Sequence, residues 1–244
     1  MDRAGIVTGS LYYLCTYMKL EEFDIKGRRC VYQADEQPEV LLVEAIDARE
    51  LDGLDVELSA IKEGCKRRFA YIALIVKDWN TELAPWTTAP VFGKVPFGDG
   101  AHSTLEIIKD GVIPEMHRRF DSLKGADIII GGYSLAGLFA LWCCYESDIF
   151  KGVAAASPSV WYPEWMRYTG SHNPNAKRIY LSLGDAEAKT KNATMSTVEQ
   201  NIRDMSDILK KLPGVDSTLV FNPGGHFKDP VLRTVQAFIW VLRP

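Results

Sequence analysis

Hydrophobic residues are arranged along the chain in two alternating patterns, one continuous and one periodic. Residues 69–76 (FAYIALIV) form a continuous apolar run rich in β-branched and aromatic side chains, which is typical of a strand buried on both faces. Comparable runs predict further strands, most clearly in the second half of the chain, at 28–33, 38–46, 127–132, 152–157, 178–184 and 217–222.

The periodic pattern predicts helices between these runs. Apolar residues recur every three or four positions over 105–120, 195–212 and 231–242. Gly111 and Pro114 interrupt the first segment, which favours two short helices over one long one. Asp229 and Pro230 predict the start of the last helix.

Strands that alternate with helices at this spacing predict an α/β fold, a mostly parallel sheet with helices on both faces. The length of 244 residues favours one domain spanning the chain, with roughly the first 60 residues supplying the leading strands of the same sheet. In such sheets ligands bind beyond the carboxyl ends of the strands, so catalytic and binding residues are expected there.

Composition limits the partners, cofactors and cellular location that we expect for the protein. Hydrophobic residues make up 47%, charged residues 25% and the net charge is −4, which argues against nucleic acid or an anionic membrane as partner. The five cysteines include no CxxC pair, and no cluster of histidine and carboxylate residues has metal spacing, so no metal and no cofactor is expected. No apolar run approaches the ~20 residues that span a bilayer, which favours the cytoplasm. The charged stretch 49–57 is expected to be a solvated face.

One strand ends in a candidate nucleophile. The segment DIIIGGYSLAGLFALW (127–142) leads from a buried strand through Gly132-Tyr133-Ser134-Leu135-Ala136 into an apolar helix. This nearly matches the G-x-S-x-G elbow, in which small neighbours let a serine occupy a strained strand-to-helix turn. Ala136 stands where glycine is usual, so we expect a slightly crowded elbow with Ser134 as the nucleophile.

A serine hydroxyl needs a base to take its proton. Of the four histidines, His226 follows the last predicted strand and is preceded by two glycines, in the chain order that α/β-hydrolases use. The acid that orients it is expected after the strand 178–184, where GDAEAK supplies Asp185 and Glu187. Glu187 is preferred because the chain can turn before it points back, and Asp185 stays the alternative.

Backbone amides and aromatic side chains complete the predicted site. The N–H of Leu135 and an N–H from the loop after residue 76, of Trp79 or alternatively of Asn80, are expected to form the oxyanion hole. Segment 157–168 follows a strand end, so Trp161, Tyr162 and Trp165, together with Tyr133, are expected to bind substrate. A short lid that packs on itself explains 157–168 equally well.

With these residues placed, the chain from about residue 69 onward resembles the putative esterase family of α/β-hydrolases, which includes enterochelin esterases, S-formylglutathione hydrolases, feruloyl esterases and mycolyltransferases. The resemblance rests on GGYSLAGLFALW, ASPSVWYP, YLSLGDAEAKTKN and NPGGHF, and DWNTELAPW is similar to the bacterial enterochelin-esterase-like branch. It implies the α/β-hydrolase fold, with Ser134 as nucleophile, His226 as base and Glu187 as acid. It also implies that Trp79 replaces a glycine of the relatives' oxyanion loop.

The sequence therefore predicts a serine esterase that cleaves a small carboxylic ester, enterochelin-type or other, through an acyl-enzyme. Two alternatives use the same residues: an acyltransferase, and a degenerate scaffold that binds a ligand without turnover. The sequence does not specify the ester or the oligomeric state.

Overall fold

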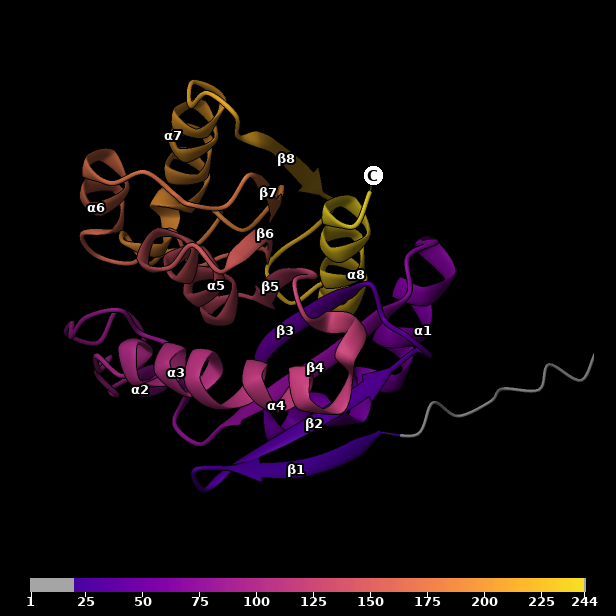
Figure 1. Cartoon of the computed structure of the whole chain (residues 1–244). Coiled ribbons are helices and arrows are strands. Elements are labelled where there is room, and N and C mark those ends of the chain that lie inside the picture. The colour runs from indigo at the N-terminus through magenta and orange to yellow at the C-terminus, as the bar shows by residue number, and fades with distance from the viewer. Residues whose placement is uncertain (1–19, 244) are drawn as a thin grey trace, which may run out of the picture.

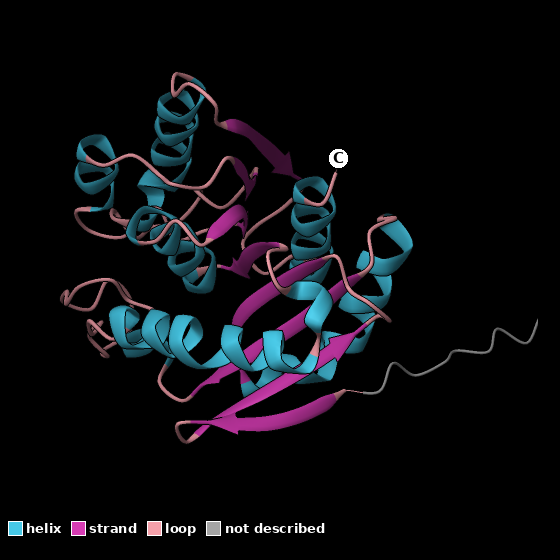
Figure 2. Cartoon of the chain, in the orientation of Figure 1, coloured by secondary structure: helices cyan, strands magenta, loops and turns pink. Residues whose placement is uncertain are grey.

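A computed structural model describes residues 20–243, so Cys15 lies outside the described range. Helices and strands alternate through most of this range (Figures 1 and 2). The strands are β1 (Glu21–Ile25), β2 (Arg28–Ala34), β3 (Val40–Asp47), β4 (Phe69–Val76), β5 (Asp127–Tyr133), β6 (Phe150–Ala156), β7 (Arg178–Gly184) and β8 (Asp216–Asn222). The α-helices are α1 (Leu54–Gly64), α2 (Trp79–Glu82), α3 (Ala101–Ile107), α4 (Ile113–Arg119), α5 (Leu135–Glu146), α6 (Trp165–Ser171), α7 (Val198–Lys210) and α8 (Pro230–Val241).

The strands form one eight-stranded sheet in the order β1-β2-β4-β3-β5-β6-β7-β8. β1 and β2 pair antiparallel, as do β2 and β4, whereas the pairs from β4 to β8 are parallel. The strands of the first 60 residues thus belong to the same sheet as the rest. Because β5, β7 and β8 run in the same direction, the loops after them emerge at one edge of the sheet.

Each face of the sheet is covered by helices, as the all-buried pattern of β4 predicts. Apolar residues of α1 and α8 pack on one face, and those of α3, α4, α5 and α7 pack on the other. Helix α5 is apolar nearly all round, and all of its residues from Leu135 to Tyr145 are buried. It therefore fixes the position of the turn that precedes it.

One local expectation differs from the structure, and two others are met. Segment 49–57 is not simply a solvated face, because it forms a 3₁₀ turn and the start of α1, and Leu54 and Glu57 are buried. As expected, the segment 101–119 forms two short α-helices, α3 and α4, and they are joined by a π-helical segment (Ile108–Val112) in which Gly111 packs against Ile25. The last helix, α8, begins at Pro230 as predicted, and its N-cap residue Asp229 lies in the left-handed region, at φ 53°, without a side-chain cap bond.

Candidate active site

Ser134 occupies the turn between β5 and α5 in a backbone conformation that serine rarely adopts, with φ 59° and ψ −120°. Such a conformation costs on the order of 1–3 kcal/mol, so the surroundings must hold it in place. Its N–H donates to the carbonyl of Ala156 at 3.1 Å, and its own carbonyl accepts from the amides of Leu138 and Ser159 at 3.0 Å. The turn presents the Ser134 hydroxyl beyond the carboxyl end of β5.

The residues two before and two after Ser134 crowd together. A Cβ atom added to Gly132 would lie 2.7 Å from the carbonyl carbon of Ala136 and 2.8 Å from its Cβ. The elbow therefore tolerates one methyl group at position 136 only because position 132 has none.

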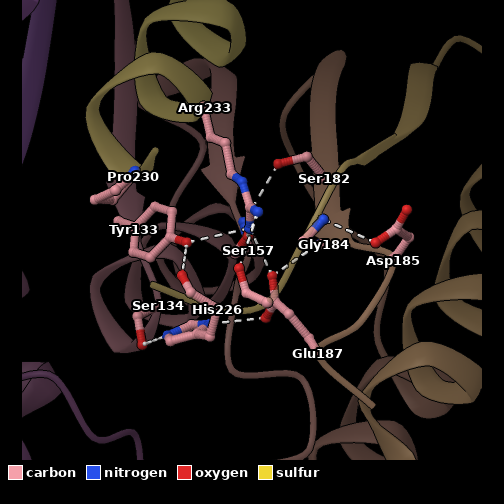
Figure 3. A network of polar contacts seen from close by, with 12 residues as sticks. Tyr133, Ser134, Ser157, Ser182, Gly184, Asp185, Glu187, His226, Pro230 and Arg233 are labelled. Carbon is pink, nitrogen blue, oxygen red and sulfur yellow. Dashed lines mark hydrogen bonds and ion pairs between the residues drawn. The ribbon is translucent and has the colours of Figure 1, made fainter. Parts of the chain in front are cut away.

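His226 follows β8 and reaches both of its expected partners (Figure 3). Its Nε2 lies 2.9 Å from Ser134 Oγ and its Nδ1 lies 2.7 Å from Glu187 Oε2. The chain therefore brings the serine, the histidine and the glutamate into one continuous line of hydrogen bonds.

Glu187 lies in the loop after β7 with its side chain only 5% exposed. Burial raises the pKa of its carboxyl, but the hydrogen bond and charge of His226 and the amide of Gly184 outweigh that effect, and the pKa is lowered overall. The Gly184 N–H donates to Oε1 at 2.7 Å. An ionised carboxylate only accepts hydrogen bonds, so Nδ1 carries the imidazole proton and Nε2 is free to accept from the Ser134 hydroxyl.

Asp185, the alternative acid, has a different partner. Its Oδ1 accepts from the backbone N–H of Gly224 at 2.8 Å, and the N–H of Ala186 donates to the Gly224 carbonyl at 3.1 Å. Asp185 thus holds the glycine turn that precedes His226, and it is Glu187 that contacts the imidazole.

The candidate oxyanion donors Leu135 and Trp79 are the first residues of two helices. Leu135 is the first residue of α5, and Trp79 is the first residue of α2, whose N-cap Asp78 accepts from the amide of Thr81 at 3.1 Å. The first amides of a helix have no partner within it and carry the positive end of its dipole. Both residues, and Asn80, line the same cavity as Ser134.

That cavity has a volume of about 420 Å³ and is largely apolar. It is lined by Trp79, Asn80, Phe92, Phe97, Ser134, Leu135, Ser159, Trp161, Met195, His226 and Phe227. Phe92 and Phe97 both lie edge-on to Trp161, with ring centroids 5.9 and 6.1 Å away. The site therefore offers an aromatic wall directly beside the serine.

Of the four side chains expected to bind substrate, the structure places only Trp161 on this cavity. Tyr162 is buried and its hydroxyl donates to the Trp86 carbonyl at 2.6 Å, while Trp165 is fully buried and stacks on Trp86. Tyr133 turns away from the cavity, and its hydroxyl donates to the carbonyl of His226. Tyr133, Tyr162 and Trp165 thus do not line this cavity, and segment 157–168 divides between a cavity wall and a packed core.

The sequence patterns did not single out several residues of the site. Phe92 and Phe97 lie in a loop whose sequence has no hydrophobic periodicity. Phe227 is exposed, and its position directly after His226 in the sequence could have marked it as a residue of the site. Arg233 is a charged residue within the apolar pattern of α8, and its side chain is 2% exposed.

A larger cavity, of about 610 Å³, opens beside the amino ends of β5 to β8, lined by residues such as Asp127, Arg178 and Asp216. Ligands of this sheet class bind at the opposite edge, where Ser134 lies, so the chemistry is assigned to the smaller cavity. Within residues 20–243 no group of three or more His, Cys, Asp or Glu side chains could hold a metal ion. No helix in the same range is long and apolar enough to cross a membrane.

Solved structures with this fold include hydrolases of several sources. An IroE-like serine hydrolase from Shewanella oneidensis aligns with a TM-score of 0.75 and 14% identity, covering 91% of this chain and 79% of its own. The siderophore hydrolase EstB from Aspergillus nidulans aligns at 0.67 and 14% identity, covering 93% and 96%. The enterobactin and salmochelin hydrolase IroE aligns at 0.63 and 17% identity, covering 93% and 95%.

At these identities the likeness shows the fold, which is that of the α/β-hydrolases and confirms the predicted class. A search among curated proteins gave no sequence match. The putative esterase family, in contrast, matches residues 61–226, which is more than half of the chain. The chain therefore belongs to the putative esterase family and is an esterase with the α/β-hydrolase fold.

Proposed function

We propose that Ser134, His226 and Glu187 form a catalytic triad that hydrolyses a carboxylic ester through an acyl-enzyme. The observation that carries this proposal is the hydrogen-bonded line from Ser134 Oγ to His226 Nε2 at 2.9 Å and from His226 Nδ1 to Glu187 at 2.7 Å, at the wall of an apolar cavity. Asp185 is bonded to Gly224 and is not given this role.

In the first step Ser134 Oγ forms a bond to the ester carbonyl carbon while His226 Nε2 takes the hydroxyl proton. The resulting imidazolium is stabilised by the ionised Glu187. When the bond from the carbonyl carbon to the alkoxy oxygen breaks, His226 gives its proton to that oxygen and the alcohol leaves.

Water then reverses the sequence. Its oxygen attacks the acyl carbon, His226 takes its proton and returns one to Ser134, and the carboxylic acid leaves. In both tetrahedral intermediates the charged oxygen is held by the amides of Leu135 and Trp79, with Asn80 as the alternative to Trp79. Each such donor contributes about 10²–10³-fold to the rate in comparable enzymes.

The cavity indicates which side of the ester it accepts. Its lining residues in the described part of the chain include no Asp, Glu, Lys or Arg, and six of them are Trp, Phe or Met. An uncharged, apolar or aryl acyl group would gain contact there without leaving a buried charge unpaired. Because two of the similar structures are siderophore hydrolases by name, enterobactin is included among the candidate substrates.

The test is hydrolysis of p-nitrophenyl acetate, butyrate and benzoate and of enterobactin, together with labelling by a fluorophosphonate probe. Ser134→Ala is expected to abolish both turnover and labelling. Ser171→Ala, which changes an exposed serine of α6, is the matched control and should remain active and labelled. Wild-type protein that neither turns over any ester nor takes up the probe would refute the proposal.

A further inference from the structure

Arg233 extends from the first turn of α8 into the space between the three loops that carry Ser134, Glu187 and His226 (Figure 3). Its guanidinium donates through Nη1 to Glu187 Oε1 at 2.8 Å and to the Tyr133 hydroxyl at 3.3 Å, and through Nη2 to the Gly225 carbonyl at 3.0 Å. These acceptors belong to the triad acid, to the residue before the serine and to the residue before the histidine. One side chain therefore contacts all three loops of the site.

A second link runs from Arg233 to the histidine itself. The Tyr133 hydroxyl that accepts from Arg233 donates in turn to the carbonyl of His226. Nη1 also donates to Ser157 Oγ at 3.0 Å, at the end of β6. The carbonyls of Gly225 and His226 are thus both linked to the Arg233 guanidinium, the first directly and the second through the Tyr133 hydroxyl.

The surroundings accommodate this side chain closely. A Cβ atom added to Gly184 would lie 2.9 Å from Arg233 Nη2 and 2.3 Å from the Gly224 carbonyl oxygen. The guanidinium fork has several donors spread over one plane, so it can bind a carboxylate and well-separated carbonyls at once, whereas the three donors of a lysine all leave from one nitrogen atom. A buried cation without a carboxylate partner would be strongly unfavourable, so Arg233 and Glu187 depend on one another.

We propose that Arg233 is a positioning residue of this esterase: it holds Glu187 ionised and oriented toward His226, and it fixes the loop that carries the imidazole. The inference rests on the proposed triad. Arg233 does not line the cavity and does not reach the substrate, so it acts through Glu187 and His226.

The charge of Arg233 has a consequence for the pH profile. A cation within about 4 Å of a carboxylate favours its ionised form and typically lowers its pKa by about 1–3 units. When Glu187 is protonated it no longer accepts reliably from Nδ1–H, and the imidazolium loses its counter-charge. Removal of the cation is therefore expected to move the acid limb of kcat/KM to higher pH.

The experiment compares the wild type with Arg233→Met, Arg233→Lys and Val235→Ala. For each protein, the rate of p-nitrophenyl butyrate hydrolysis and the rate of inactivation by a fluorophosphonate are measured as functions of pH. The unfolding temperature is measured as well. Val235 is buried in the same helix and faces the apolar core, so Val235→Ala controls for lost packing. Arg233→Met should lower kcat by about 10²-fold with little change in KM, and should move the acid limb upward by about 1 pH unit or more. Arg233→Lys should retain the wild-type limb with an intermediate rate.

A purely structural role predicts something else: a lower unfolding temperature and a smaller active fraction, with the acid limb where the wild type has it, as expected for Val235→Ala. That result for Arg233→Met would overturn the inference. The ¹⁵N shifts of the His226 ring give a readout without turnover. They should report the Nδ1–H tautomer in the wild type and a mixture in Arg233→Met, and an unchanged tautomer would overturn the inference too. Failure of the wild type to label or turn over refutes the triad instead, so the two failures are distinguishable.

Discussion

Glu187 and His226 meet across 39 positions of the chain, with Glu187 Oε2 2.7 Å from the imidazole Nδ1. The contact follows from topology, since β7 and β8 are neighbouring parallel strands and the loops after them emerge side by side. Asp185, in the same loop as Glu187, binds the Gly224 amide instead. Two carboxylates that look interchangeable in the sequence thus have separate partners.

Substitution of the two acids should separate their roles. Glu187→Gln is expected to lower kcat by about 10²–10⁴-fold, because an amide can donate to Nδ1 and so favour the wrong tautomer. Asp185→Asn keeps an oxygen that can accept from Gly224 N–H, so its rate should stay within about 10-fold of the wild type. Steady-state kinetics at pH 8 checks both, and a larger loss for Asp185→Asn than for Glu187→Gln would reverse the assignment.

The elbow makes a second prediction. Gly132→Ala places a methyl group 2.7 Å from the carbonyl carbon of Ala136, so the turn must shift and the Ser134 hydroxyl with it. We expect a loss of activity of at least about 10²-fold, since small displacements of a catalytic group have such effects.

Ala136→Gly is the informative companion. In the double variant the Cβ at position 132 would still meet the backbone of residue 136, whose carbonyl oxygen lies 2.8 Å away. Ala136→Gly should therefore not restore the activity of Gly132→Ala, and alone it should cost about 1 kcal/mol of unfolding free energy as an Ala-to-Gly change in a helix. Full rescue, measured by probe labelling rates, would show that only the two methyl groups conflict.

Local pattern accounts for much of this fold, as particular elements show. The largely apolar runs 69–76 and 178–184 coincide with β4 and β7, because a strand buried on both faces leaves few positions for polar side chains. The chain order of Ser134, Glu187 and His226 indicated that the three loops carrying them meet, and the side chain of His226 lies within hydrogen-bond distance of the other two. Helix α1 was not predicted because its first turn contains Asp55 and Glu57, and the burial of Glu57 beside Glu44 of β3 is a tertiary contact that no periodicity encodes.

The cavity and the Arg233 network could not be predicted for the same physical reason. Which side chains of 157–168 face Ser134 depends on packing against Trp86, 76 residues before Tyr162, and no local periodicity encodes that contact. A single arginine in an apolar helix gives no hint of its acceptors, which come from three other loops.

A third prediction concerns the buried carboxyl pair behind the elbow. Glu44 of β3 and Glu57 of α1 line one small buried cavity, and the Tyr71 hydroxyl donates to Glu44 at 2.7 Å. Burial raises the pKa of Glu44 to about 7 and that of Glu57 well above its usual range, where the neighbouring carboxyls Glu44 and Glu50 add to the effect. The folded state therefore retains protons that the unfolded state releases above about pH 4.5.

The direction in which stability changes with pH follows from these raised pKa values. The stabilisation is fully present below about pH 4.5 and is lost as the pH rises through the folded-state pKa values of the two carboxyls. Glu57→Gln removes one of the titrating groups, so the free energy of unfolding in urea should fall less steeply between pH 5 and 8. Glu63→Gln, on the exposed side of α1, is the control and should leave the slope unchanged. An unaltered slope in Glu57→Gln would contradict the assignment.

The last prediction concerns selectivity for the acyl group of the ester. Two aromatic residues at the cavity are exposed, so they can be replaced without disturbing the packed core. Phe227 is 92% exposed and Phe92 49% exposed, yet both line the cavity beside Ser134. Phe92→Ala and Phe227→Ala should lower kcat/KM for p-nitrophenyl benzoate and butyrate by about 10-fold, since lost apolar contact in a pocket is worth about 1–3 kcal/mol. p-Nitrophenyl acetate, whose acyl group offers a single methyl for such contact, should be hydrolysed at nearly the wild-type rate.

Val95→Ala provides the matched control for this selectivity, because Val95 is 60% exposed on the same loop as Phe92 but is not among the residues that line the cavity. Its ratio of benzoate to acetate hydrolysis should equal that of the wild type. Tyr162→Phe extends the comparison to the core, since it removes only the hydroxyl that bonds to Trp86 and should lower the unfolding temperature while leaving the ratio unchanged. If Val95→Ala or Tyr162→Phe changes the ratio as much as Phe92→Ala does, the acyl group is not bound in this cavity.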